Sequence, residues 1–503
     1  MRAICGILAA GALLVTAPAF GEDEAPPEGA VPRETLAYTT PAEAKPLRAL
    51  LELGAVFTLG FAWYATSAPT VQHWDPGYRW STFREKLTGV DLSTDANSFG
   101  TNFIGHPLGG TGYYLSARSN RLTIAQSFGI AVAGSLLWEM FGEVSEVVST
   151  NDMIVTPLAG LSIGEATTQL AAHFDRSGPS GAHRVLGAVF GPFKTMNDAL
   201  DGLEPARAPR GVAGSDWHRF RLEAASTFAY AEPSDPTHQA WWPEVRAEAS
   251  SEIVHLPDFG RSGRAGGWFD DGNASRIRLT ASGGSSGLSD LAFETLVVLA
   301  GGYYRSRYLD GAGNPWGGNG LLGFSSGFQY TLHQYRRDEG RAMDRIASVQ
   351  PLGVTFHQQG ALGVPRIATT LELGPDFGAV TPVALRGFSG LANQLPPVQA
   401  QRGYYFAVGG HLRAAVTLTA GPVELGGEFR AEGFKDVSGS KYPNPVSLAD
   451  TLATFGGSLG YRHAETNVTP RAFVERRVRA GRVAEARESV AETTLGLGIG
   501  AIF

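Results

Sequence analysis

Two glutamates in the first half of the chain stand out because their surroundings are almost entirely apolar. Glu139 and Glu143 lie in the segment Trp138-Glu-Met-Phe-Gly-Glu, inside a run that is otherwise nearly all apolar from Phe128 to Val148. Their spacing is about one helical turn, so both carboxylates share one stripe of a helix, and we expect at least one to face the interior. A buried carboxylate must be paired, bound to a metal or protonated.

Other polar residues in the same half allow two kinds of site. A divalent metal is one, because carboxylate-rich helical bundles hold such ions through oxygen and nitrogen ligands. Its candidate ligands are His106, Glu139, Glu143 and Glu165. A hydrogen-bonded network that fixes helix packing is the commoner use of such residues, so we predict a network and no cofactor. Its candidate members are Asn102, His106, Arg118, Glu139, Glu143, Asp152 and Glu165.

Covalent catalysis has less support in the sequence. The predicted strands contain His333, His357, His411 and His463, with many serines nearby. No local signature of a nucleophile elbow singles out one of these serines, and His-Glu-x-x-His does not occur. A histidine without an oriented base or nucleophile has no assigned role, so we expect ordinary barrel residues and favour a protein that is not an enzyme.

The order of the segments predicts an exported protein with two domains. Met1-Arg2, an apolar stretch to Val15 and small residues at Ala19 and Gly21 follow the order of a secretory signal. Cys5 is the only cysteine and lies in this signal, so disulfides and thiolate metal sites are excluded from the mature chain. The expected parts are a signal peptide at 1–21, a flexible leader at 22–46, a helical domain at 47–202, a linker at 203–216 and a barrel at 217–503.

Apolar and polar residues alternate through the second half to its last position, as they do in β-strands with one apolar face. In the first stretch, Phe220, Leu222 and Ala224 alternate with Arg219, Arg221 and Glu223. The mature chain has no stretch of about twenty uninterrupted apolar residues, and the best candidate, Leu47 to Ala65, carries Arg48 and Glu52. A membrane protein without helical spans must be a closed barrel.

The predicted fold class is therefore an α+β membrane protein. An N-terminal helical domain precedes a C-terminal antiparallel transmembrane β-barrel of about 12 strands. Charged residues of the early strands would face inward, and we expect them to pair with one another rather than to line a selective path. They are Arg219, Arg221, Glu223, Glu244, Arg246, Glu248, Arg276 and Arg278.

The polar motifs of the first half also resemble a known family. Asn102-x-x-x-His106-Pro followed by two tyrosines, Trp-Glu-x-x-x-Glu from Trp138, Asn151-Asp152, and Gly-x-x-x-Gly-Glu ending at Glu165 are similar to an uncharacterised domain-of-unknown-function family of bacterial envelope proteins, often followed by a barrel. The resemblance covers roughly Phe99 to Gly202. It implies an envelope protein and carries no activity to these residues.

The leading expectation is an outer-membrane protein that binds or passes an unidentified ligand. The alternatives are a hydrolase acting on phospholipid or lipopolysaccharide and a metal-dependent activity in the helical domain. About 150 helical residues are too bulky for a 12-strand lumen, so we expect this domain at the periplasmic mouth. Expected partners are outer-membrane lipid and the barrel-assembly machinery, because Phe503 resembles the terminal aromatic that this machinery reads. The net charge of -7 gives no reason to expect nucleic acid.

Overall fold

The computed structural model describes the chain from residue 43 onward, with gaps. The described residues are 43–67, 80–88, 92–95, 97–143, 148–176, 181–203, 217–231, 241–256, 259–260, 262–272, 274–285, 287–337, 340–384, 402–437, 446–463 and 467–502. The expected signal peptide, nearly all of the leader, nearly all of the linker and the terminal Phe503 lie outside this set.

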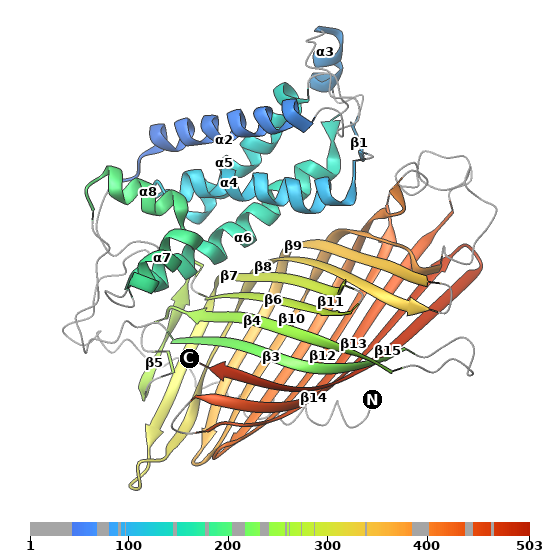
Figure 1. Ribbon diagram of the computed structural model, residues 1–503. Helices are drawn as coiled ribbons and strands as arrows, with labels where there is room; N and C mark the ends of the chain where they lie inside the picture. Colours follow the sequence, from blue (N-terminus) through green and yellow to red (C-terminus); the bar gives the residue numbers. More distant parts are fainter. Residues whose placement is uncertain are drawn as a thin grey trace. The chain divides into compact units, whose positions relative to one another are not determined.

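Twelve antiparallel strands close into a barrel, shown from green through yellow to red in Figure 1. They are β3 (Trp217–Ala231), β4 (Trp241–Val254), β6 (Ala274–Gly284), β7 (Gly287–Leu309), β8 (Pro315–Arg337), β9 (Gly340–Leu362), β10 (Pro365–Val380), β11 (Tyr405–Ala420), β12 (Val423–Asp436), β13 (Leu448–Tyr461), β14 (Val468–Val483) and β15 (Ala486–Ile502). β15 pairs back to β3, and a short strand, β5 (Gly263–Phe269), pairs with the end of β7. The predicted fold class and strand number are both confirmed.

The two faces of the barrel wall follow from the alternation in the sequence. Leu222 is 56% exposed, whereas its neighbours Arg221 and Glu223 on β3 line an internal cavity. Directly paired residues of antiparallel strands point to the same side of a sheet. Leu222 therefore marks the outer face and Glu223 the inner face, and every other residue can be assigned by following the register around the barrel.

We name the two rims by the strand ends they contain. At the proximal rim, β3 begins with Trp217 and β7 ends with Leu309. At the distal rim, β10 ends with Val380 and β11 begins with Tyr405. The longest connection between barrel strands, 381–404, is at the distal rim, and the next longest, 255–273, which contains β5, is at the proximal rim, where β9 and β10 are joined by only two residues.

The helices of the first half are packed side by side, and we call them the helical layer. They are α2 (Pro46–Ser67), α3 (Trp80–Thr88), α4 (His106–Arg118), α5 (Ile124–Leu137), α6 (Thr150–Arg176), α7 (Gly181–Phe190) and α8 (Pro192–Leu200). A π turn, η1 (Thr101–Gly105), leads into α4, and a second, η2 (Trp138–Gly142), follows α5. α5 begins with a capping box in which Thr123 and Gln126 each satisfy the other's backbone amide.

α6 packs against the outer wall of the barrel. Its apolar side chains Val155, Ala159 and Ile163 share one buried cluster with Phe328, Val349 and Phe406 of the strands. A series of directly paired residues connects this cluster to the exposed Leu222: Phe406, Ala379, Ala347, Tyr330, Phe293, Leu279, Ala249 and Leu222. All of them are therefore on the outer face. The helical domain was expected at the mouth of the lumen, but the structure places its longest helix along the wall.

Candidate functional site

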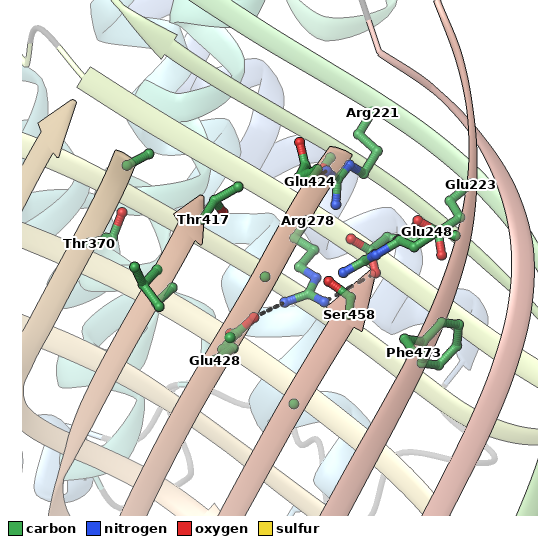
Figure 2. A pocket seen from close by; sticks show the side chains of 18 of the residues that line it. Arg221, Glu223, Glu248, Arg278, Thr370, Thr417, Glu424, Glu428, Ser458 and Phe473 are labelled. Carbon is green, nitrogen blue, oxygen red and sulfur yellow. Dashed lines mark hydrogen bonds and ion pairs between the residues drawn. The ribbon is translucent and has the colours of Figure 1, made fainter. Parts of the chain in front are cut away.

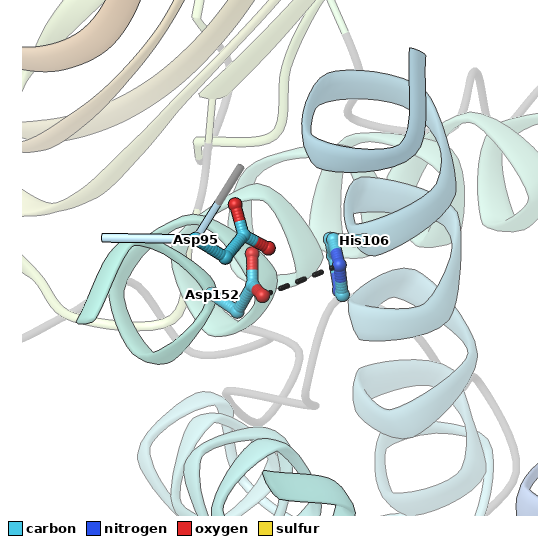
Figure 3. A group of neighbouring side chains, drawn as sticks. All are labelled: Asp95, His106 and Asp152. Carbon is cyan, nitrogen blue, oxygen red and sulfur yellow. Dashed lines mark ion pairs between the residues drawn. The ribbon is translucent and has the colours of Figure 1, made fainter. Parts of the chain in front are cut away.

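Two aspartates and a histidine from three parts of the helical layer meet near the start of α6. The ligand-capable atoms of Asp95, His106 and Asp152 lie within 4.8 Å of one another, and His106 Nε2 is 3.4 Å from Asp152 Oδ2. Figure 3 shows both carboxylates and the imidazole directed toward one point. A short parallel pairing of Leu92–Ser93 with Val148–Ser149 explains the meeting, because it holds the Asp95 loop beside the first turn of α6.

Glu139 and Glu143 join this group through Asp152. Oxygens of these three residues also lie within 4.8 Å of one another, and all three side chains are buried. The π turn at the end of α5 positions the two glutamates: Glu139 Oε2 accepts from the Ser149 amide at 2.8 Å, and Glu143 Oε1 accepts from Trp138 Nε1 at 3.1 Å. At least one of these glutamates was expected to face the interior, and the structure buries both. We call Asp95, His106, Glu139, Glu143 and Asp152 the carboxylate cluster.

Several atoms of the carboxylate cluster have no hydrogen-bond partner among the described residues. They are Asp152 Oδ2, Glu139 Oε1 and His106 Nε2, together with Oδ1 of the neighbouring Asn102, whose side chain is 0% exposed. Asn102 Nδ2 donates to Asp95 Oδ1 at 2.7 Å and to the Tyr404 hydroxyl at 2.9 Å, so it anchors the cluster to the barrel. Buried oxygens without donors are costly unless a cation or a proton supplies what is missing.

Glu165, the fourth expected ligand, has different partners. It lies 13 residues after Asp152 on the same helix, which corresponds to about 20 Å. Arg118 donates to both of its carboxylate oxygens, from Nε at 2.8 Å and from Nη2 at 3.1 Å, and the Tyr114 hydroxyl donates at 2.6 Å. The seven residues of the expected network thus divide into two sites: Asn102, His106, Glu139, Glu143 and Asp152 at one end of α6, and Arg118 with Glu165 toward the other.

Sequence reasoning missed Asp95, which precedes the expected domain motifs in an irregular segment. Its carboxylate is held by the amides of Asn97, Asn102 and Asn151, with Nδ2 to oxygen distances of 2.7, 2.7 and 3.3 Å. One sequence pattern could have pointed to Asp95: an asparagine lies next to or near an aspartate both in Asp95-Ala-Asn97 and in Asn151-Asp152. Nothing in that spacing indicates that two such pairs, more than fifty residues apart, come together.

The second possible site is the barrel lumen. A cavity of about 210 Å³ in its proximal half is lined by arginines and glutamates from strands on opposite sides (Figure 2). They pair between strands that are not neighbours in the sheet: Arg221 with Glu424 at 2.8 Å, Arg246 with Glu475 at 3.0 Å, and Arg471 with Glu223 at 2.9 Å. Arg278 also bridges Glu248 and Glu428. This mutual pairing of opposite charges differs from the one-signed ring of a selective pore.

Apolar side chains fill the inner face at the distal rim. Val380, Tyr405 and Phe434 belong to a buried inner cluster that also includes Ala384 and Leu448. Arg479 on β14 is fully buried and lies between two aspartates. Its Nε is 3.0 Å from Asp344 Oδ2, and its Nη1 is 2.7 Å from Asp450 Oδ1. Packed side chains thus cover the inner face of β9–β14 at the distal end of the described lumen.

This packing, together with the paired charges in the lumen, predicts that the barrel does not conduct. We expect the purified protein, inserted into a planar lipid bilayer, to give no discrete ion-conducting steps at moderate voltage. A parallel recording from any open porin provides the positive control for insertion and detection. Regular steps of constant size from this protein would show that the apolar cluster opens and that the described lumen is one state of a pore.

A closed antiparallel barrel with an apolar outer face is the fold of outer-membrane proteins, and this chain has that fold. Residues 91–193 match the model of a family described as a domain of unknown function, DUF3943. The expected resemblance to such a family, followed by an outer-membrane barrel, is confirmed. No curated protein matches the sequence at a significant level.

Solved structures that resemble the chain are outer-membrane barrels of low sequence identity. A loop-deletion mutant of OmpT from Vibrio cholerae is 10% identical, with coverage of 57% of this chain and 100% of that one and a TM-score of 0.21. The outer-membrane channel DcaP of Acinetobacter baumannii is 8% identical, with coverage of 57% and 97% and a TM-score of 0.22. The NalP translocator domain from Neisseria meningitidis is 12% identical, with coverage of 61% and 93% and a TM-score of 0.20.

Proposed function

We propose that this protein is an outer-membrane component that binds one divalent metal ion in its helical layer, with the closed barrel as its membrane anchor. The observation that carries the proposal is that two groups of possible ligands, Asp95–His106–Asp152 and Glu139–Glu143–Asp152, share the buried Asp152, and that Asp152 Oδ2 and Glu139 Oε1 have no hydrogen-bond donor among the described residues. Carboxylates with one imidazole suit a first-row ion such as Mn²⁺ or Zn²⁺.

Comparison with other buried carboxylates of the chain supports a cation in the carboxylate cluster. Glu165 is neutralised by Arg118, and Asp450 by Arg479. Near the cluster, Lys86 donates to the backbone carbonyl oxygens of Glu139 and Glu143, at 2.6 and 2.5 Å. This lysine therefore offsets the negative charge while leaving carboxylate oxygens available for a metal.

A lipid hydrolase has less support from the geometry. His411 is paired with a carboxylate, since its Nδ1 lies 2.8 Å from Asp376 Oδ2. Both residues line the lumen rather than the outer face, so a phospholipid in the surrounding bilayer would not reach them. We therefore favour ion binding over hydrolysis.

We also propose that the proximal rim faces the periplasm. Outer-membrane barrels have short periplasmic turns and longer loops on the outside, and the longest connection here, 381–404, is distal. The helical layer begins near Lys45 and ends near Asp201, whose side chains are ion-paired. α2 and α8 therefore start and end together, on what would be the periplasmic side. The carboxylate cluster, beside Tyr404, would lie near the outer rim.

Metal titration of the purified, chelator-treated protein tests the proposed site. We expect one Mn²⁺ or Zn²⁺ per chain by isothermal calorimetry. Asp152→Asn removes the central ligand and should weaken binding at least about 100-fold, the upper end of what loss of a ligand's supporting partner costs. Glu85→Gln is the matched control, because it makes the same kind of change at an exposed carboxylate of the helical layer, on α3. Equal affinity in the wild type and Asp152→Asn, or no binding by the wild type, would overturn the proposal.

A further inference from the structure

We infer that the helical layer crosses the outer membrane beside the barrel, with α2 and α5 in contact with lipid acyl chains. This inference goes beyond metal binding and does not depend on it. It concerns a surface: the outer faces of α2 and α5, most of which the rest of the described protein leaves exposed. The occupant we propose for that surface is the hydrocarbon of the bilayer.

The first support is that α6 runs from one rim of the barrel to the other. Its C-terminal part lies at the proximal rim, where the His173 and His218 rings are 4.6 Å apart and Phe174 stacks on Phe220. Its N-terminal part lies at the distal rim, near Tyr404 and Phe406. A helix of 27 residues is about 40 Å long, which exceeds the hydrocarbon thickness of about 30 Å. α6 therefore occupies wall that lipid would otherwise cover.

The other long helices also run between the level of the proximal rim and the level of the distal rim. Near the proximal rim, Arg48 at the start of α2 binds Asn120 and Asp201, and Arg118 at the end of α4 lies 3.4 Å from Asp271 of the β5–β6 turn. At the distal level, the Phe61 ring of α2 meets Trp138 at the end of α5, at 4.9 Å. Consecutive helices α2, α4, α5 and α6 thus alternate in direction, as membrane-crossing segments do.

The lengths and surfaces of α2 and α5 fit a bilayer. The segments Pro46–Trp63 and Ile124–Gly142 are long and apolar enough to span one, and only 17% and 33% of them are buried inside the protein. Such low burial distinguishes them from core helices of a soluble domain. Their exposed large side chains are apolar: Leu47, Leu50, Leu51, Leu59, Phe61 and Trp63 on α2, and Val132, Leu136, Leu137 and Phe141 on α5 and η2.

The charged residues that argued against a helical span face inward. Arg48 and Glu52 are the charged residues of α2, and Glu52 is 8% exposed. Arg48 is satisfied by Asn120 and Asp201 at the proximal end of the layer. Polar groups in a bilayer must find partners inside the protein or near an interface. Exposed apolar faces formed by many neighbouring side chains mark interaction surfaces, and a face without exposed charge suits the hydrocarbon of a bilayer.

Site-directed spin labelling in phospholipid vesicles tests this inference. A Cys5→Ser background has no other cysteine, so single labels can be placed at Leu59→Cys on α2 and Leu136→Cys on α5. Leu222→Cys on β3 provides the lipid-facing reference, and Glu43→Cys, exposed before α2, provides the water-facing reference. Accessibility is measured with oxygen, which concentrates in lipid, and with a water-soluble nickel chelate.

We expect both helix labels to behave like the Leu222→Cys label, accessible to oxygen and protected from the chelate. Labels that behave like Glu43→Cys would place the layer in water and overturn the inference. Immobile labels protected from both reagents would also overturn it, because they would indicate a protein partner or a second copy. The labelling measurement needs no metal. A result that overturns the membrane inference would therefore not bear on the proposed ion site, which the metal titration tests separately.

Discussion

Replacing Arg118 with methionine is expected to destabilise the helical layer by about 3–5 kcal/mol, the cost of leaving one member of a buried ion pair alone. Arg118 is 2% exposed and Glu165 0% exposed, and two hydrogen bonds join them. The variant leaves a buried carboxylate at the point where α4, α6 and the β5–β6 turn meet. Its effect should appear as a loss of free energy of unfolding in denaturant titrations of the detergent-solubilised protein, followed by tryptophan fluorescence.

A second substitution separates loss of charge balance from loss of packing. The double variant Arg118→Met with Glu165→Leu removes both charges and should recover most of the lost free energy, because an apolar pair of similar size often replaces a buried ion pair at little cost. Arg462→Met is the control for a general effect of losing an arginine, since Arg462 is exposed. A loss below about 1 kcal/mol in Arg118→Met alone, within the usual range for ordinary substitutions, would contradict the assigned role.

The second large effect is expected at the crossing of α4 and α6. A Cβ atom added at Gly110 would lie 1.8 Å from the Thr156 carbonyl oxygen, and one added at Gly160 would lie 2.4 Å from the Gly110 carbonyl oxygen. The two backbones are thus in direct contact, as at glycine-mediated helix crossings in membranes. Gly110→Val must push the helices apart, and we expect a cost of at least about 3 kcal/mol, the upper end for overpacking.

The neighbouring glycine provides a matched control for this prediction. A Cβ at Gly109 would meet nothing within 4 Å, so Gly109→Val makes the same chemical change in the same helix without a clash. We expect Gly109→Val to unfold at nearly the wild-type denaturant concentration and Gly110→Val to unfold much earlier or to fail to insert. Equal stability of the two variants would mean that α4 and α6 do not approach as closely as described.

The barrel could be predicted from the sequence because the pattern that indicates it, the alternation of apolar and polar residues, lies within each single strand. Alternation such as Leu222 between Arg221 and Glu223 assigns each residue to a face, whatever its partner strand is. The position of the helical layer could not be predicted in this way. Outward residues under α6, such as Ala347 and Phe406, are apolar like those that face lipid, so the pattern does not distinguish a wall covered by a helix from a wall covered by lipid.

The candidate site could be predicted only in part, for a related reason. Burial of Glu139 and Glu143 follows from their apolar neighbours in the sequence. Grouping Glu165 with them required knowing where α6 begins, and the helix continues through Pro157 back to Thr150. That length separates Glu165 from Asp152 and brings Asp152 into the cluster. The contribution of Asp95 depends on the parallel pairing of Leu92–Ser93 with Val148–Ser149, and segments of only two residues have no recognisable strand pattern in the sequence.

The measurement that tests the ion site most directly is electron paramagnetic resonance of Mn²⁺ bound to the purified protein, with histidine nitrogen labelled. We expect a hyperfine coupling from one histidine nitrogen to the metal, lost in His106→Gln while the bound manganese remains detectable through its carboxylate ligands. A nitrogen coupling that persists in His106→Gln, or bound manganese without any such coupling in the wild type, would contradict the proposed ion site.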